Sequence, residues 1–494
     1  MFKFLREYFL ILLSGMFDKQ YYLEHYRDVK SSGMNPLVHF IKYGWKENRN
    51  PSSLFNLEHY LEVHPELVHQ EINPLIHFIQ LEIDKGTKVR FIPSDLIGYD
   101  YVTLTSEIVQ KNLSDRGVEA AKRATDIIIF PIIDWGFRFQ RPQQIARQLA
   151  KLGHRIFYIN TGHDDFQTSA PLIKKLHNDI YEIKLVGGHK KLTLLSALTN
   201  EEIDQLEVSM RVVRELLLME TAIIKVDAPY WTKLVLRLKD GYGWHLVFDC
   251  MDLFTDFKSE SLADFSDEEL LLTQSDLVLT TSHPLYDHAR AHNPNVILVP
   301  NAADFDYFHQ AKDFVFCEEM KNLSPPIIGY YGAVANWFDS ELIGTLASEH
   351  PEWTFFIVGH TYLGDLSPFE NLPNVHITGE RPYRQLIGFL SHFDVCIIPF
   401  KKLPLTQATN PVKLFEYLSA GKPVVATRLE EMSKYSEWIR LAETPQEWEK
   451  ALQDSLVEEK SAELLEKRFN FARTNTWEIR GAQIEVELSK LIHK

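Results

Sequence analysis

Lys413 and Glu416 lie one helical turn apart in the stretch NPVKLFEYLSAGKPVV, which spans residues 410–425. At this spacing the two side chains share one face of a helix, where they form either a solvated ion pair or the edge of a ligand site. The stretch follows a predicted buried strand, DVCIIPF (394–400), and a nine-residue loop. In open parallel sheets ligands bind beyond the carboxyl ends of the strands, so the position favours a ligand site.

The ends of this predicted helix are also informative. Asn410 is a good N-cap, Pro411 suits the first turn, and Gly421 stands where a helix ends. The free N–H groups of the first turn can then bind an anion. With Lys413 adding positive charge and Glu416 accepting hydrogen bonds from a sugar diol, the site suits a diphosphate attached to a ribose.

Other charged residues follow strands expected earlier in the chain. The loop DWGFRFQR carries Asp134, Arg138 and Arg141, and the segment FDCMDLF carries Asp249 and Asp252. The two arginines are candidate acceptor or phosphate ligands. Each carboxylate could orient an acceptor hydroxyl or take its proton, and the alternative for each is a helix cap or a turn.

Strands alternate with amphipathic helices from residue 126 onward, which predicts parallel sheets with helices on both faces. A break near residue 311 divides them into two doubly wound domains. The predicted strands are 126–134, 155–160, 222–227, 246–250, 276–282 and 296–300, followed by 327–332, 354–359, 374–379, 394–400 and 423–427.

A repeat without gaps precedes these domains. The segments that begin at Phe17 and Phe55 share nine identical residues at a constant offset of 38. Each unit is predicted to be two short helices, and Asn-Pro starts the second as N-cap and first-turn residue. His39 and His77 are therefore expected to pack or cap within their own units rather than to bind a metal.

The predicted organisation has five parts, and the first part begins with an apolar stretch. The apolar start of the chain is too short for a signal peptide, and we interpret it as a helix that caps the repeat, with an interfacial membrane segment as the alternative. The parts are a helical repeat module (1–84), a connector (85–125), a first α/β domain (126–310), a second α/β domain (311–475) and a helix that returns to the first domain (476–494).

Composition restricts the function classes. A net charge of −16 disfavours a nucleic-acid partner, and three widely spaced cysteines indicate a reducing compartment. We expect a cytoplasmic protein, with residues 1–84 as a candidate contact to the inner face of the membrane or to assembly proteins. No DxD-like loop is present, so neither a metal nor another cofactor is expected.

Several segments resemble one family of enzymes. NPVKLFEYLSAGKPVVAT resembles the donor-binding segment of retaining GT-B glycosyltransferases of the large family four. RPQQIARQLAKLGHRIFYI is similar to the first strand–helix–strand unit of bacterial cell-surface polysaccharide glycosyltransferases, and VPNAADFDYF, FDCMDLF and YYGAVANWFD resemble further segments of that group. The resemblance covers about residues 125–480. It implies two Rossmann-like domains that face a cleft.

The resemblance also implies a reaction. A sugar, either a hexose or a deoxyhexose, would pass from a nucleotide-sugar to an oligosaccharide or lipid-linked glycan acceptor in surface polysaccharide biosynthesis, with retention of anomeric configuration. Enzymes of this kind are thought to react on one face, where the leaving phosphate helps to deprotonate the acceptor. No nucleophilic side chain is then required, and Asp249, Asp252 and Asp134 are the catalytic candidates.

The donor would be held by residues of the second domain. Glu416 would bind the ribose hydroxyls, and Lys413 with the first-turn amides would bind the diphosphate. Gly332 would let a phosphate approach the backbone, and the loop with Arg381 and Tyr383 would carry the nucleobase. The remaining residues of the implied donor segment are Thr409, Asn410 and Leu414.

Three positions depart from the family pattern. Ala408 stands where a glutamate is usual, the loop AVANWFDSE lacks the usual Arg/Lys pair, and Leu253 replaces an acidic residue. Lys413 would then neutralise the diphosphate with help only from Arg138 or Arg141. These departures favour one alternative, a catalytically degenerate GT-B protein that recruits assembly partners through its repeats. A third alternative is another GT-B chemistry, such as that of a nucleotide-sugar epimerase.

Overall fold

The computed structural model describes residues 7, 11, 17–32, 34–47, 49–52, 57, 73–84, 102–103, 125–162, 171–177, 179–187, 192, 196–254, 266–313, 317–361, 364–458 and 461–492. Contacts divide the chain into two compact units, Met1–Asp100 and Tyr101–Lys494. Most of the apolar start, the first half of the second repeat and most of the predicted connector lie outside the described residues. In the part of the chain that is described, no helix is long and apolar enough to cross a membrane.

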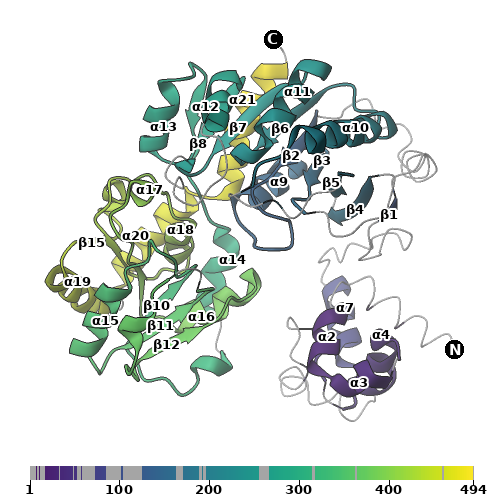
Figure 1. Ribbon diagram of the computed structural model, residues 1–494. Helices are drawn as coiled ribbons and strands as arrows, with labels where there is room; N and C mark the ends of the chain where they lie inside the picture. The colour runs from purple at the N-terminus through teal and green to yellow at the C-terminus, as the bar shows by residue number, and fades with distance from the viewer. Residues whose placement is uncertain are drawn as a thin grey trace. The chain divides into compact units, whose positions relative to one another are not determined.

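The first unit is helical (Figure 1). The predicted Asn-Pro helix starts are confirmed, because Asn35 and Asn73 each accept a hydrogen bond from the backbone N–H two residues further on, at 3.0 and 3.1 Å. His39 Nδ1 lies 3.1 Å from the hydroxyl of Tyr22 in the same repeat. The described helices of the first unit are α2 (Lys19–His25), α3 (Arg27–Ser32), α4 (Pro36–His39), the π-helical turn η1 (Phe40–Gly44) and α7 (Pro74–Asp84).

The first sheet of the second unit has nine strands in the order β1-β4-β5-β3-β2-β6-β7-β8-β9. The seven strands from β5 to β9 in this order run parallel, as predicted, whereas β4 pairs antiparallel with both β5 and β1. The bounds are β1 Val102–Thr103, β2 Asp126–Phe130, β3 Ile156–Ile159, β4 Leu172–His177, β5 Ile180–Lys184, β6 Ala222–Val226, β7 His245–Cys250, β8 Leu277–Thr280 and β9 Val296–Leu298.

Alternate residues of the central strand β2 serve two apolar layers. Ile127 and Ile129 pack with residues of α9 and of the last helix, α21, whereas Ile128 and Phe130 pack with residues of α10 and α11. A strand that is buried on both faces carries a continuous apolar run, as DIIIF does. The helices of this domain are α9 Arg141–Lys151, α10 Asn200–Leu216, α11 Thr232–Tyr242, α12 Ser266–Gln274 and α13 His283–Arg290.

The second sheet is parallel throughout, with six strands in the order β12-β11-β10-β13-β14-β15. Its strands are β10 Ile327–Tyr331, β11 Thr354–Val358, β12 Val375–Thr378, β13 Val395–Ile398, β14 Val424–Thr427 and β15 Arg440–Ala442. Its helices are α14 Phe305–His309, α15 Ser340–Glu349, α16 Leu386–His392, α17 Pro404–Gln407, α18 Val412–Ser419, α19 Pro445–Glu458 and α20 Ala462–Arg473. The arrangement confirms two Rossmann-like domains.

The last helix, α21 (Trp477–Ile492), lies against α9 of the first domain, as Figure 1 shows in yellow and blue. Arg480 Nε donates to the carbonyl of Pro300 at 2.9 Å, which ties the helix to the crossover between the domains.

Three details differ from the sequence expectations. Val102–Thr103 forms an edge strand inside the segment predicted as a connector, and the β4–β5 hairpin was not predicted. The nine-residue loop before α18 contains the short helix α17. These elements are short or partly polar, so they carry little periodic signal.

Candidate functional site

Helix α18 begins and ends for clear local reasons. Pro411 is its N-cap residue, with extended backbone angles, and the helix proper starts at Val412. At the other end Gly421 adopts φ +75°, and its N–H bonds to the carbonyl of Leu418 while the next N–H, of Lys422, bonds to that of Tyr417. This is a Schellman motif, and it confirms Gly421 as the terminating glycine.

The predicted N-cap role of Asn410 is wrong. Its side-chain oxygen accepts a hydrogen bond from the backbone N–H of Asn301 at 2.9 Å, and Asn301 Nδ2 donates to the Asn410 carbonyl at 2.6 Å. The Asn410 amide donates to Glu431 and to the Tyr435 hydroxyl. Asn410 therefore joins the two domains directly before α18, and this contact leaves the helix N-terminus without a side-chain cap.

Glu416 is buried, with 4% of its surface exposed. The hydroxyl of Tyr331, the last residue of β10, donates to its Oε2 at 2.8 Å, and Tyr383 also hydrogen-bonds its carboxylate. Burial raises the pKa of Glu416 to about 7, although both tyrosines and Lys413 act to lower it. A buried carboxylate at the edge of a parallel sheet is not a solvated surface ion pair.

Lys413 is half-buried and lies over two aromatic rings, with Nζ 5.4 Å from the Tyr330 ring centre and 5.0 Å from that of Phe400. Burial lowers the pKa of Lys413 to about 8. Among the residues that the structure describes, none forms a salt bridge with Lys413. The positive charge of Lys413 is therefore stabilised by the faces of the two rings and by the negative charge of Glu416, without a direct salt bridge.

Gly332 brings the backbone close to Lys413. Its φ is +145°, and a Cβ built there would lie 2.8 Å from the Tyr330 hydroxyl and 3.0 Å from Lys413 Cε. At the end of the neighbouring strand, a Cβ on Gly359 would lie 1.9 Å from the Gly332 carbonyl oxygen. The two strand ends can approach each other this closely only because both positions are glycines.

Four predicted donor-binding residues remain, and each has its own contacts in the structure. Arg381 pairs with Glu319 at 2.8 Å, while the Tyr383 ring stacks on Tyr307 with centroids 5.9 Å apart. The Thr409 hydroxyl donates to a backbone carbonyl within α17, and Leu414 is fully buried in the core of the second domain. Of these residues, the structure brings only Tyr383 into contact with Glu416.

Tyr383 also reaches the first domain. Its ring lies 5.6 Å from that of Phe139, and Gln144 Nε2 donates to its hydroxyl at 3.4 Å. Close by, Arg138 forms an ion pair with Glu380 at 2.5 Å. The predicted phosphate ligand Arg138 thus faces the second domain, as predicted for a cleft residue, but it is engaged by a carboxylate.

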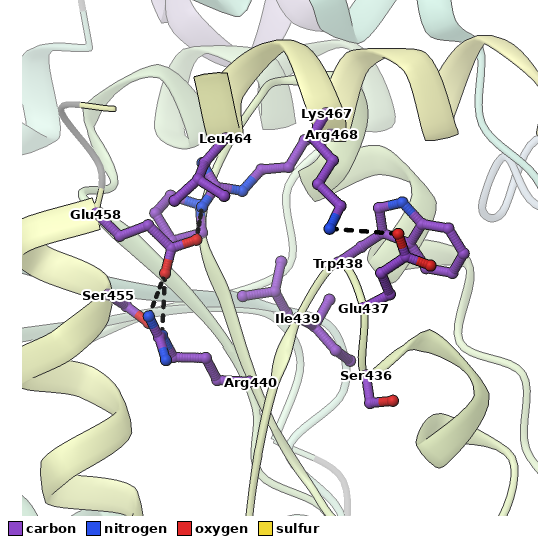
Figure 2. Close-up of a pocket in the computed structure, with 12 residues that line it drawn as sticks. Ser436, Glu437, Trp438, Ile439, Arg440, Ser455, Glu458, Leu464, Lys467 and Arg468 are labelled. Atoms are coloured by element: carbon purple, nitrogen blue, oxygen red, sulfur yellow. Dashed lines mark hydrogen bonds and ion pairs between the residues drawn. The ribbon is translucent and has the colours of Figure 1, made fainter. Parts of the chain in front are cut away.

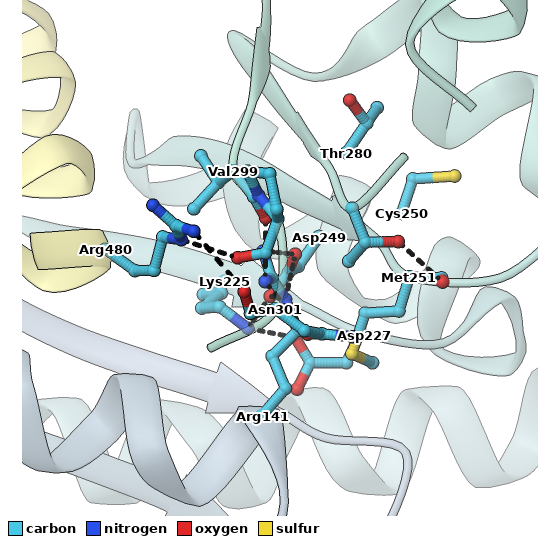
Figure 3. A network of polar contacts seen from close by, with 12 residues as sticks. Arg141, Lys225, Asp227, Asp249, Cys250, Met251, Thr280, Val299, Asn301 and Arg480 are labelled. Carbon is cyan, nitrogen blue, oxygen red and sulfur yellow. Dashed lines mark hydrogen bonds and ion pairs between the residues drawn. The ribbon is translucent and has the colours of Figure 1, made fainter. Parts of the chain in front are cut away.

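Four buried charges form a network at the carboxyl ends of β6 and β7 and the start of α9 (Figure 3). Arg141 contacts Asp249 with both Nη2 and Nε, at 2.8 to 3.1 Å, and Lys225 contacts Asp249 at 2.7 Å and also pairs with Asp227. Arg141 further donates to the carbonyl of Val299 at 2.9 Å. Arg141 and Asp249 therefore reach a phosphate or an acceptor only if this network opens.

The two carboxyl groups of the network differ electrostatically. Burial raises the pKa of Asp227 to about 7, although Lys225 acts to lower it. Burial acts in the same direction on Asp249, but Arg141 and Lys225 outweigh it and hold its pKa below the usual value. Asp249 is therefore a stably ionised partner of the two cations.

The other two carboxylate candidates have different surroundings. Asp134 Oδ1 accepts hydrogen bonds from both the backbone N–H and the hydroxyl of Thr161, each at 2.7 Å. Asp252 is half-buried directly after β7, and burial raises its pKa to about 6. No hydrogen bond to the Asp252 carboxylate comes from the residues that the structure describes, so among the three it is the best placed to accept a proton.

The surroundings of Ala408 account for one departure from the family pattern, the absence of a glutamate at this position. It is 5% exposed and packs into the apolar cluster of the first domain, which also contains Phe254 and Leu285. The position is therefore an apolar contact between the domains, and a glutamate would be buried there without an evident partner.

Sequence reasoning missed the residues that support these groups. Tyr331, Glu380, Asn301 and Glu431 all contact a predicted site residue, but only Tyr331 carried a usable signal, since it directly precedes Gly332 at a strand end. The others contact residues more than 20 positions away, and such pairings depend on the fold.

A cavity of about 220 Å³ lies elsewhere in the second domain (Figure 2). It opens at the amino-terminal ends of β14 and β15, opposite to the edge that carries Glu416. Its charges are largely paired with one another, Glu458 with Arg440 and Arg468 at 2.6 and 2.5 Å and Lys467 with Glu437 at 3.3 Å. Across the described ranges no cluster of three or more potential metal ligands occurs.

The two Rossmann-like domains together have the GT-B fold. The fold of this chain matches sucrose-phosphate synthase from Thermosynechococcus elongatus with a TM-score of 0.60 at 16% identity, over 75% of this chain and 100% of that one. The crystal structure of HepE from Anabaena in complex with UDP matches with a TM-score of 0.55 at 12% identity, over 74% and 100% of the two chains.

Sequence comparisons identify the group more closely. Residues 325–457 match the family described as Glycosyl transferases group 1, so the second domain is a group 1 glycosyl transferase domain. The chain is also 29% identical over 269 residues to the "Putative teichuronic acid biosynthesis glycosyltransferase TuaH" of Bacillus subtilis, which covers 50% of this chain and 68% of that protein. These matches agree with the predicted likeness to family four.

Proposed function

We propose that this protein transfers a sugar, a hexose or deoxyhexose, from a nucleotide-sugar to an oligosaccharide or lipid-linked glycan during surface polysaccharide biosynthesis. The transfer retains anomeric configuration and needs no metal. The observation that carries the proposal is a buried carboxylate, Glu416, and a half-buried cation, Lys413, one turn apart on α18 and next to Gly332, which directly follows β10. The similarity to TuaH supports the glycan class, and the UDP complex of HepE supports the donor class.

The residues take distinct roles in this reaction. Lys413 and the first-turn amides of α18 stabilise the departing diphosphate, and Glu416 orients the ribose. The leaving phosphate takes the proton of the acceptor hydroxyl, and the Asp252 carboxylate is the side-chain alternative because burial raises its pKa to about 6. Catalysis then depends on positioning and on charge stabilisation rather than on a nucleophile.

A nucleotide-sugar panel tests the proposal. We expect at least one UDP- or GDP-sugar to raise the melting temperature of the full-length protein and to release nucleoside diphosphate when acceptor glycan is added. Glu416→Ala should weaken binding at least tenfold, because it removes hydrogen bonds from sugar hydroxyls to a charged group. If no nucleotide or nucleotide-sugar stabilises the protein, the proposed activity is wrong.

A second candidate is a GT-B scaffold without activity. It is favoured by Ala408, whose apolar contact between the domains replaces a polar ligand position. In that case the helical repeats of residues 1–84 would recruit assembly partners. A protein that binds nucleotide-sugars but releases no nucleoside diphosphate with any acceptor would support this candidate.

A further inference from the structure

We propose that Tyr331 is the positioning residue that orients Glu416 for the donor ribose, an inference that rests on the proposed function. Tyr331 is 4% exposed and touches the carboxylate through its hydroxyl, which donates to Oε2 at 2.8 Å. The residue lies at the end of β10, directly before Gly332, where an added Cβ would lie 3.0 Å from Lys413 Cε.

Both ends of the Tyr331 residue are fixed by α18. Its backbone N–H donates to the hydroxyl of Tyr417 at 3.0 Å, and the two rings meet edge to face with centroids 4.8 Å apart. Tyr417 follows Glu416 on the same helix, so β10 and α18 hold each other in register. Tyr331 therefore cannot follow the carboxylate if Glu416 rotates, and the hydrogen bond selects one orientation.

This orientation matters because a ribose diol is best bound by a carboxylate in a fixed plane. With Oε2 held by Tyr331, the plane of the Glu416 carboxylate is set before the ligand arrives, and less side-chain entropy is lost on binding. The phenol also stabilises the ionised form of Glu416, which burial disfavours. Loss of this one hydroxyl should weaken the donor complex without removing any direct ligand contact.

The first test needs no ligand. Burial raises the folded-state pKa of Glu416, so its contribution to stability is present at low pH and is lost as pH rises through about 7. Tyr331→Phe raises the pKa of Glu416 further. In profiles of melting temperature against pH, the loss of stability that accompanies ionisation of Glu416 should then extend to higher pH. When position 416 is glutamine, the difference in melting temperature between the variants with Tyr331 and with Phe at position 331 should be independent of pH. A pH-dependent difference that persists there would overturn the coupling.

The second test uses UDP and GDP as calorimetric probes of the full-length protein. We expect Tyr331→Phe to weaken the tighter probe roughly tenfold at pH 8, and to do so less in the Glu416→Gln background. Tyr230→Phe is the matched control, because that buried hydroxyl donates to the Pro131 carbonyl of the first domain at 2.8 Å.

The outcomes separate the two proposals. If the wild-type protein binds neither UDP nor GDP, the proposed function fails, and the positioning role fails with it. If the wild type binds a probe and Glu416→Gln weakens that binding while Tyr331→Phe binds the probe as Tyr230→Phe does, only the positioning role is overturned.

Discussion

At the scale of single residues, Glu416 and Lys413 must both be charged to bind a nucleoside diphosphate in the proposed way. Burial raises the pKa of Glu416 to about 7 and lowers the pKa of Lys413 to about 8, so the two pKa values lie close together. Glu416 loses its charge as pH falls below about 7, and Lys413 loses its charge as pH rises above about 8.

Binding of UDP or GDP should therefore follow a bell-shaped pH profile with its maximum between about 7 and 8. Titration calorimetry from pH 5.5 to 9.5 measures it. Glu416→Gln should flatten the acidic limb, and Lys413→Arg should flatten the alkaline limb because a guanidinium stays protonated. A profile in Glu416→Gln that keeps its acidic limb would show that another group titrates.

At the scale of elements, α18 depends on its terminating glycine. Gly421→Ala should destabilise the protein by more than about 1 kcal/mol, because φ is +75° and the new Cβ would meet Leu465 Cδ1 at 2.3 Å. Gly241, exposed near the end of α11, is the matched control, since a Cβ there meets nothing within 4 Å. Gly241→Ala should stabilise by about 0.5–1 kcal/mol. Urea unfolding measures both, and equal effects would contradict the argument.

Elements with strong local signals could be predicted from the sequence. The strand DIIIF and the Gly421 stop are apolar or conformational patterns that act over a few residues. The start of the strand at residue 126 and the helix end at Gly421 were predicted correctly, whereas the strand ends at Phe130 rather than at residue 134. Asn410 shows why other features could not be. An Asn-Pro pair is a good helix start locally, but a partner 109 residues away, Asn301, takes its side chain. The Arg141–Asp249 pair likewise exists only once α9 and β7 are adjacent.

At the scale of the whole molecule, the buried network should contribute to stability. Arg141→Leu leaves Asp249 with Lys225 as its remaining cation, and we expect a loss of about 3–5 kcal/mol in urea unfolding at pH 7. The loss should shrink as pH falls, because Asp249 contributes stability only while it is ionised. The control is Arg237→Leu, whose exposed pair with Asp204 should be worth less than about 1 kcal/mol.

The apolar contact at Ala408 should hold the two domains of the second unit together. Ala408→Glu places a carboxylate in that contact, where ionisation is costly, so we expect a lower melting temperature and a larger radius of gyration at pH 8. Ala408→Gln has nearly the same size without the charge and should be milder. As pH falls below the raised pKa of the new glutamate, its effect should approach that of the glutamine. If Ala408→Glu instead strengthens UDP or GDP binding without loss of stability, the position is a ligand site rather than a domain contact.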